Sequence, residues 1–261
     1  FVGAGAGKGG TTSAPYSSGE YNVAIGYQAF DAFTSATRCV VIGPNAGGAI
    51  TTGYNNTIMG YQAGVALNTG QDNVLVGTYA GYQLTDGTKN VLIGSSAGEN
   101  LSTNTNFNVM IGFQAGEHAD GATTAAVNNA YFGYQAGRYM DDGQNNIAIG
   151  YQPMYANSSE GNSGHELIAI GYQALYSVTD ADNNIAIGYQ AGYSLTTARY
   201  NVLIGDHAGY SLTSTSDSNE NVMIGNNAGR NADAATNAAH YNVYVGAGAG
   251  YYMDDGDSNV Y

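Results

Sequence analysis

A short apolar phrase recurs along the whole chain: Asn, three apolar residues, Gly, two variable residues, Ala and Gly. Two clear copies begin at Asn73–Gly77 and at Asn201–Gly205. The glycine that closes the apolar run falls at positions 3, 26, 43, 60, 77, 94, 112, 133, 150, 171, 188, 205, 225 and 246. The commonest step is 17 residues. This period predicts an all-β fold, a parallel β-solenoid or β-roll of about 14 coils, formed as one repeat array over residues 1–261.

Both faces of each predicted strand are apolar. Alternate residues of a strand point to opposite sides. The first and third residues after Asn are mostly β-branched, and we expect them inside the coil. The second residue is apolar in every complete repeat, although a solvated outer face would be polar. An exposed apolar row is an association surface. The second position is therefore predicted to form a subunit interface, at Leu75, Leu92, Met110, Leu203, Met223 and Tyr244.

Three coils around a common axis, a homotrimer, is the preferred arrangement for this interface. A lateral dimer and a covering segment from elsewhere are the alternatives. Phe1 and Tyr261 hold the same phase of the repeat. We therefore expect the sequence to be a segment of a longer fibre, or to polymerise head to tail through its unpaired ends.

The corner and strand-start positions support the same fold. Ala stands three residues after the strand glycine in 13 of 14 repeats, and Gly follows in 11 of 14, with Phe30, Met154 and Leu175 as exceptions. A small residue followed by Gly is typical of a tight corner with positive φ. Asn opens most strands, with Cys39 and Leu167 as exceptions. Stacked coils should join these asparagines into a ladder with a rung about every 4.8 Å.

Composition and charge narrow the range of functions. The chain has 39 Gly, 23 Tyr, six Lys plus Arg and a net charge of −14. A nucleic-acid partner is not expected, because it would require a basic surface. No stretch approaches the roughly 18 apolar residues of a membrane span, so we expect no membrane contact by this segment. Cys39 is the single cysteine, which excludes an intrachain disulfide, and a buried structural role is favoured over a reactive thiol.

Few residues suggest cofactor or catalytic chemistry. The acidic turns carry oxygen ligands suited to Ca²⁺, and the candidate ligands are Asp141, Asp142, Asp254 and Asp255. Asp and Gly are also ordinary turn formers, so no required cofactor is expected. The four histidines share no metal-ligand spacing, and no acid–base set marks one coil as catalytic. The protein is therefore not expected to be an enzyme, although carboxylates from neighbouring coils leave a glycan-cleaving activity as an alternative.

The tyrosines fall at two repeating positions. One set directly follows the strand glycine, and a second lies five or six residues after it. In a stack of coils these sets form aromatic columns, which either stabilise the stack or provide a surface for glycans. The candidates for glycan contact are Tyr139, Tyr193, Tyr210, Tyr251 and Tyr252.

The sequence NVAIGYQA at 22–29, repeated nearly unchanged at 184–191, closely resembles the head repeats of trimeric autotransporter adhesins. It also resembles a 17-residue version in phage tail-fibre-like proteins. The resemblance covers essentially the whole chain, whose period is longer than that of the adhesin-head unit. It implies a trimeric, left-handed parallel β-roll that is displayed on a cell or virion surface and used for attachment.

A structural and adhesive surface fibre is therefore the expected function, with glycans as the expected partners and an extracellular location, as a cell-surface or virion appendage. A purely structural extracellular filament assembled end to end, and a fibre-borne glycan-cleaving enzyme, are the alternatives. Glycan binding separates the first two, and turnover of glycans separates the third.

Overall fold

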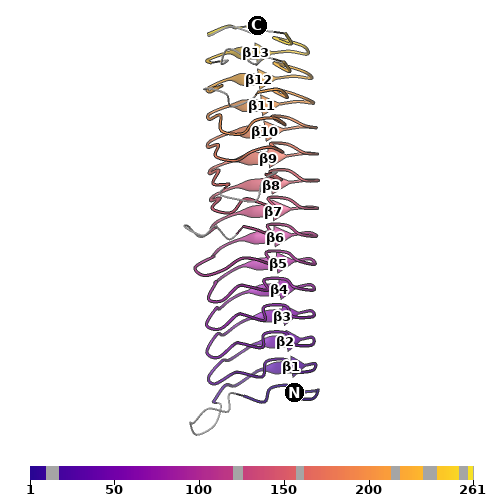
Figure 1. Ribbon diagram of the computed structural model, residues 1–261, viewed down its shortest axis with the longest axis vertical. Coiled ribbons are helices and arrows are strands. Elements are labelled where there is room, and N and C mark those ends of the chain that lie inside the picture. The colour runs from indigo at the N-terminus through magenta and orange to yellow at the C-terminus, as the bar shows by residue number, and fades with distance from the viewer. Residues whose placement is uncertain are drawn as a thin grey trace. The chain divides into compact units, whose positions relative to one another are not determined.

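The computed structural model describes residues 1–9, 18–119, 126–156, 162–212, 218–231, 240–252 and 258–260. The chain divides into two compact units, Phe1–Asn129 and Ala130–Tyr261. Each unit is a stack of similar coils, and each coil contributes one strand of three residues (Figure 1). No helix occurs among the described residues. Each unit is thus the predicted kind of array, a parallel β-solenoid.

The strands of the first unit pair in chain order and in parallel, with Val23 opposite Val40 and Val40 opposite Thr57. Its six strands are β1 (Val23–Ile25), β2 (Val40–Ile42), β3 (Thr57–Met59), β4 (Val74–Val76), β5 (Val91–Ile93) and β6 (Val109–Ile111). Equivalent repeat positions are direct neighbours, because the register advances by one whole repeat at each strand.

The second unit has the same pairing, with Ile185 opposite Val202 and Val202 opposite Val222. Its strands are β7 (Ala130–Phe132), β8 (Ile147–Ile149), β9 (Ile168–Ile170), β10 (Ile185–Ile187), β11 (Val202–Ile204), β12 (Val222–Ile224) and β13 (Val243–Val245). The extra residues of the longer repeats leave the register of these strands unchanged.

The two strand faces are the reverse of the prediction. The second residue of every strand is buried, whereas the first and third are half-buried or exposed. The predicted interface residues Leu75, Leu92, Met110, Leu203, Met223 and Tyr244 therefore lie in the cores of single coils, and the prediction that they form a subunit interface is wrong.

The narrow interior of a coil explains this orientation. In the coil of β4, for example, Leu75 shares the core with Ala80 and Leu84, and all three are fully buried. One side chain from the strand, the corner alanine and one apolar residue from the returning segment form the core of this coil. Pointing the second strand residue inward contributes one side chain to this space, whereas the reverse orientation would contribute two.

Core volume is balanced between the strand and the corner. The corner glycines have positive φ, as predicted, and a Cβ at Gly137 would lie 2.5 Å from the ring of Tyr131. The three non-glycine residues at this corner also have positive φ, and all three are fully buried: Phe30, Met154 and Leu175. Each belongs to a coil whose central strand residue is alanine, namely Ala24, Ala148 and Ala169. A large corner side chain therefore fills the space that a small strand residue leaves.

The coil of β10 is an informative exception, since it combines Ala186 with a corner glycine, Gly192. A Cβ at Gly192 would lie 2.8 Å from both Leu175 and Leu203, which belong to the adjacent coils. Those two leucines occupy the space, so the volume balance extends over neighbouring coils.

The asparagines that open the strands form the predicted ladder. In the first unit, Asn73 donates from Nδ2 to Oδ1 of Asn56 at 3.1 Å and to the carbonyl of Gly87 at 2.8 Å. The backbone N–H of Asn73 also donates to Asn56 Oδ1. The second unit repeats the pattern from Asn184 through Asn201. These buried amides thus satisfy one another and the backbone of the returning segment.

Cys39 interrupts the ladder and is fully buried, as predicted. Its backbone N–H still donates to Asn22, whereas its thiol donates to the carbonyls of Thr37 and Gly53 at 3.5 and 3.6 Å. Burial raises the pKa of this thiol, an effect only partly opposed by hydrogen bonding to Asn56. A buried thiol whose pKa is raised is a structural residue and a poor nucleophile.

Candidate functional site

The outward residues of the strands form the most regular apolar surface of each unit. We call the first and third residues of β1–β6, and separately those of β7–β13, the outer strand face of that unit. Every one of these residues except Thr57 is apolar. Several are well exposed, including Val23 at 44%, Ile25 at 40% and Ile149 at 39%. An apolar row that stays half-exposed or exposed along a whole stack of coils is typical of an interaction surface.

Four tyrosines in the second unit stack into a column beside the end of the strands. They directly follow successive strand glycines, and all are exposed: Tyr134, Tyr151, Tyr172 and Tyr189. Their ring centroids lie 5.0, 5.1 and 5.0 Å apart, with the planes within 8° of parallel. The separation is close to the spacing of paired strands, so the solenoid itself sets the distance between rings.

A second column has the same spacing and is formed by Tyr155, Tyr176, Tyr193 and Tyr210. An arginine covers each end. The guanidinium of Arg138 lies 5.8 Å from the Tyr155 ring and donates to its hydroxyl at 3.1 Å. Arg230 lies 5.5 Å from the ring of Tyr210. Cation–π contacts thus close both ends of the second column.

A glutamine ladder belongs to the coils of the first column. The residues that follow the first-column tyrosines are Gln135, Gln152, Gln173 and Gln190. Gln152, Gln173 and Gln190 each donate from Nε2 to Oε1 of the preceding glutamine, at 2.7, 3.1 and 2.9 Å. All four residues have a φ of 50 to 53°. This shared left-handed backbone gives the four side chains the same starting direction.

Aromatic residues at the glutamine position show where this ladder lies. His207 occupies that position one coil further on, and its ring lies 5.2 Å from Tyr189 of the first column and 5.3 Å from Tyr210 of the second. In the first unit, Tyr79 makes the equivalent contacts with Tyr61 and Tyr82, both at 5.5 Å. The glutamine position therefore lies between the two columns. We call the two columns and the glutamine ladder the tyrosine–glutamine strip.

The strip presents ring edges and hydroxyls, because the stacked rings cover one another's faces. Its hydroxyls also lie near each other. Burial raises the pKa of Tyr176, and electrostatic interaction with neighbouring tyrosines adds to this effect. These neighbours are, in decreasing order of influence, Tyr155, Tyr193, Tyr151 and Tyr172. Burial, followed by Tyr210 and Tyr172, raises the pKa of Tyr193. The hydroxyls of Tyr176 and Tyr193 therefore lie within electrostatic reach of tyrosines in both columns, and a tyrosine hydroxyl can both donate and accept a hydrogen bond.

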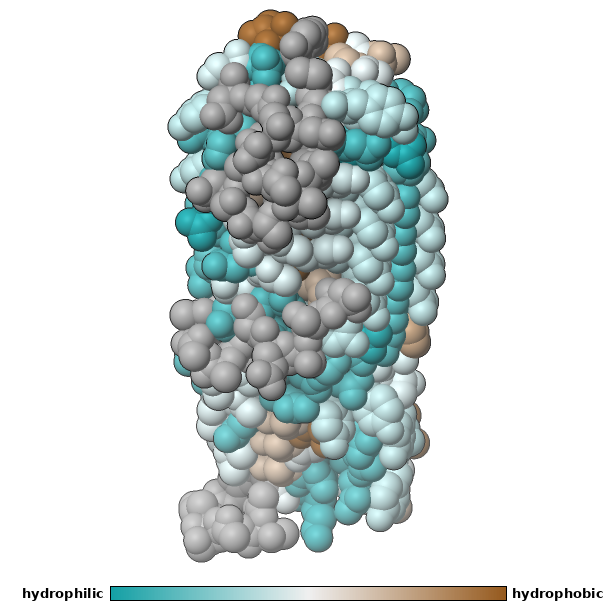
Figure 2. Space-filling model, turned by 45° about the horizontal axis from the view of Figure 1, so that its top comes forward, coloured by the Kyte–Doolittle hydropathy of each residue, from teal (hydrophilic) through white to brown (hydrophobic). Residues whose placement is uncertain are grey.

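Figure 2 shows that side chains of similar hydropathy line up in rows along the surface in view. Such rows follow from the in-register pairing, which places each repeat position beside its equivalent in the next coil.

The structure separates the predicted glycan-contact residues into three groups. Tyr193 and Tyr210 are members of the second column. Tyr139 packs edge-on against Tyr155 at 5.3 Å, with the guanidinium of Arg138 4.8 Å from its own ring. Tyr251 and Tyr252 contact each other at 4.4 Å, and Arg230 lies 5.9 Å from Tyr251. The residue-level prediction omitted the first column and the glutamine ladder. The signal was the triplet Gly-Tyr-Gln, which recurs in phase in four successive coils.

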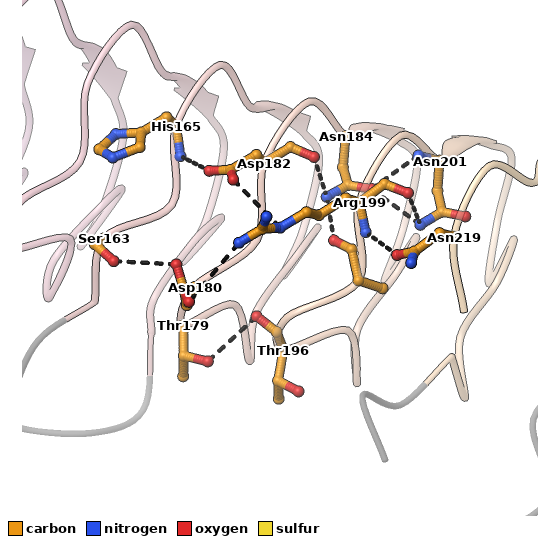
Figure 3. Close-up of polar contacts among 11 residues, drawn as sticks. Ser163, His165, Thr179, Asp180, Asp182, Asn184, Thr196, Arg199, Asn201 and Asn219 are labelled. Carbon is orange, nitrogen blue, oxygen red and sulfur yellow. Dashed lines mark hydrogen bonds and ion pairs between the residues drawn. The ribbon is translucent and has the colours of Figure 1, made fainter. Parts of the chain in front are cut away.

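A polar cluster lies on another side of the second unit, where isolated bridges join Gln144 to His165 and His165 to Asp182 (Figure 3). Arg199 lies between two carboxylates, 3.3 Å from Asp182 and 3.9 Å from Asp180. Asp182 also accepts from the backbone N–H of His165 at 3.1 Å. These contacts join successive coils, and partly exposed ion pairs of this kind contribute about 0–1 kcal/mol each. The cluster therefore has a structural role, which is to link successive coils.

The calcium candidates divide between two locations. Asp141 and Asp142 lie in a turn, where the backbone N–H of Asp142 donates to Asn162 at 3.1 Å. Asp254 and Asp255 lie outside the described residues. The part of the chain that the structure describes contains no group of three or more His, Cys, Asp or Glu side chains arranged to hold a metal ion.

Within the same described ranges, no helix has the length and apolar character needed to cross a membrane. Comparison of the chain with protein-family models, curated proteins and solved structures returned no match.

Proposed function

We propose that this protein is a subunit of a structural and adhesive extracellular fibre, and that copies associate through their outer strand faces. The observation that carries the proposal is the outer strand face itself, which is apolar in every described coil apart from Thr57. No strand places a charged side chain on it. Burying such a face against a partner is favourable by about 25 cal/mol per Å² of apolar surface.

The repeat favours a second copy of the same chain as the partner. A partner must present an apolar row with a period equal to the coil spacing, and an identical solenoid has such a row. The net charge of −14 keeps the remaining surface soluble and disfavours stacking through other faces. Three copies around one axis is the proposed assembly, with the outer strand faces directed toward that axis.

Attachment is assigned to the tyrosine–glutamine strip, which belongs to repeat positions different from those of the outer strand face. A surface of hydroxyls, amides and aromatic edges suits a glycan partner. The location that follows is the outside of a cell or a virion.

Sedimentation velocity at micromolar concentration tests the assembly. The native protein is expected to sediment as a trimer, and the double variant Ile187→Lys/Ile204→Lys as a folded monomer. Thr197→Lys/Glu166→Lys is the matched control, since it places two lysines at exposed positions away from the outer strand face. A native monomer, or a lysine pair at 187 and 204 without effect on the assembly, would contradict the proposal.

A further inference from the structure

The tyrosine–glutamine strip has a periodic chemistry that specifies more than a general affinity for glycans. We infer that the strip binds an extended, neutral polysaccharide lying along the stack of coils, through rows of hydroxyl and amide groups and without stacking of sugars on ring faces. This inference rests on the proposed adhesive function and identifies the class of ligand and the mode of contact.

Ring geometry excludes face stacking along most of the strip. Each interior ring has a parallel ring about 5 Å away on both sides, as Tyr172 has Tyr151 and Tyr189. In the second column, Tyr176 is likewise enclosed by Tyr155 and Tyr193. A sugar lying on a ring face would need to displace one of these neighbours. The accessible groups are therefore edges and hydroxyls.

Periodicity favours a linear polymer over a compact ligand. Equivalent hydroxyls recur at every coil because the rings recur at 5.0–5.1 Å. The glutamine amides recur in the same coils, and the ladder uses one of the two N–H donors of Gln152, Gln173 and Gln190. A chain of sugars that repeats its own hydroxyls along one axis can use several rungs together, whereas a single sugar can use only one or two.

Charge favours a neutral ligand. The strip contains no acidic or basic residue, and the chain as a whole carries a net charge of −14. A polyanion would be repelled by this charge. The two arginines beside the second column are engaged with rings, and Arg230 also donates to Asn227 at 3.0 Å. They stabilise the column ends and do not form a continuous basic surface.

Affinity electrophoresis through gels that contain a soluble polysaccharide provides the test. The probes are a neutral β-linked glucan, a neutral mannan, a neutral N-acetylhexosamine polymer and, for comparison, a uronic-acid polymer. The test variant is Tyr151→Phe/Tyr172→Phe/Tyr176→Phe/Tyr193→Phe, which keeps every ring and removes four hydroxyls. The matched control, Tyr21→Phe/Tyr54→Phe/Tyr200→Phe/Tyr241→Phe, removes four hydroxyls from exposed tyrosines outside the strip.

The expected result is retardation of the native and control proteins by at least one neutral polymer, with binding about tenfold weaker for the test variant. Calorimetry with fragments of the bound polymer should show affinity rising with length until a fragment spans four coils, roughly 15–20 Å. Equal binding by the test variant, preference for the uronic-acid polymer, or no retardation by any neutral polymer would overturn the inference.

The oligomeric state separates this inference from the proposed function. If the protein forms trimers and attaches to cells but binds no neutral polymer, the inference fails and the fibre proposal stands. If Ile187→Lys/Ile204→Lys does not alter assembly, the fibre proposal fails on its own evidence.

Discussion

The two units share one coil design and differ in the exposed residues that directly follow their strand glycines. After its strand glycines the first unit carries Ala4, Tyr27, Pro44, Tyr61, Thr78, Ser95 and Phe113, so no two successive coils place tyrosine there. At the same position the second unit has four tyrosines in succession, each followed by glutamine. Both units nevertheless keep the asparagine ladder and a fully buried central strand residue. The comparison shows that core and ladder positions maintain the coil, while the exposed positions directly after the strand glycines are free to acquire a surface function.

Charging the core should have the largest effect on either unit, and the effect should be the same in both. Leu75→Asp in the first unit and Leu203→Asp in the second each bury a carboxylate at a position that is fully inaccessible to solvent. We expect each to destabilise its own unit by several kcal/mol and to unfold it, because a buried charge has no partner there.

Hydrogen exchange resolved by peptide would show which unit loses protection. The surface substitution Thr197→Lys serves as the control and should leave protection unchanged. A folded Leu203→Asp protein that merely dissociates from its partners would instead restore the original assignment of this residue to an interface.

Exchanging side-chain volume between the central strand residue and the corner residue should have an intermediate effect on stability. It tests whether the two volumes are coupled in the core of a coil. Leu175→Gly removes a buried side chain above Ala169 and should cost about 3–4 kcal/mol. Adding Ala169→Leu recreates the pairing of Leu203 with Gly209 in the coil of β11 and should recover more than half of this loss.

Denaturant unfolding of the single and double variants gives the coupling free energy directly. The single variant Ala169→Leu completes the double-mutant cycle. It should be destabilising, since Leu175 already fills the space. Additive effects of the two substitutions would show that the volumes of strand and corner are not coupled.

The smallest expected effect concerns alkaline pH and tests the stacked tyrosines of the second column. The folded-state pKa values of Tyr176 and Tyr193 are raised, chiefly by burial and then by neighbouring tyrosines. A raised pKa means that the folded state retains protons that the unfolded state has lost. This contribution to stability is therefore fully present below about pH 10, the ordinary tyrosine value, and is lost as pH rises through the folded-state pKa.

Thermal melts between pH 9 and 11 measure this contribution. The double variant Tyr176→Phe/Tyr193→Phe should show a shallower fall of melting temperature with pH than the native protein. Tyr27→Phe/Tyr54→Phe, which removes two hydroxyls from exposed tyrosines outside the columns, is the matched control. Equal slopes for both double variants would show that column tyrosines do not differ from other exposed tyrosines.

Much of the fold was predictable because the repeat determines the register. The strand glycines, the positive-φ corners, the asparagine ladder and the aromatic columns all follow from residues that recur in phase. The orientation of the strands did not follow, because three consecutive apolar residues give no polar position from which to recognise the outside. The informative signal was variation in size. The central residue ranges from Ala24 to Tyr131, and the corner residue changes in the opposite sense, from Phe30 to Gly137.

The candidate site was harder to predict, because stacking removes the property that made tyrosine attractive. A single exposed ring can bind a sugar on its face, whereas a ring such as Tyr172 has a parallel neighbour on each face. Sequence phase indicates that a column exists, but only the ring planes show which atoms it presents. The covering of the second column by Arg138 and Arg230 likewise depends on side-chain direction.

The stacked strand glycines make the junctions between coils equivalent, which affects how the repeat can change in evolution. A Cβ at Gly26 would lie 2.6 Å from the carbonyl oxygen of Gly43, one coil away, and the φ of Gly26 is 138°. Consecutive coils therefore meet backbone to backbone at this point, with no side chain to distinguish one junction from another. A coil can be duplicated, deleted or exchanged by recombination without creating a mismatched joint there. Recombination can therefore change the length of the array by whole coils, while the surface residues of each coil vary independently.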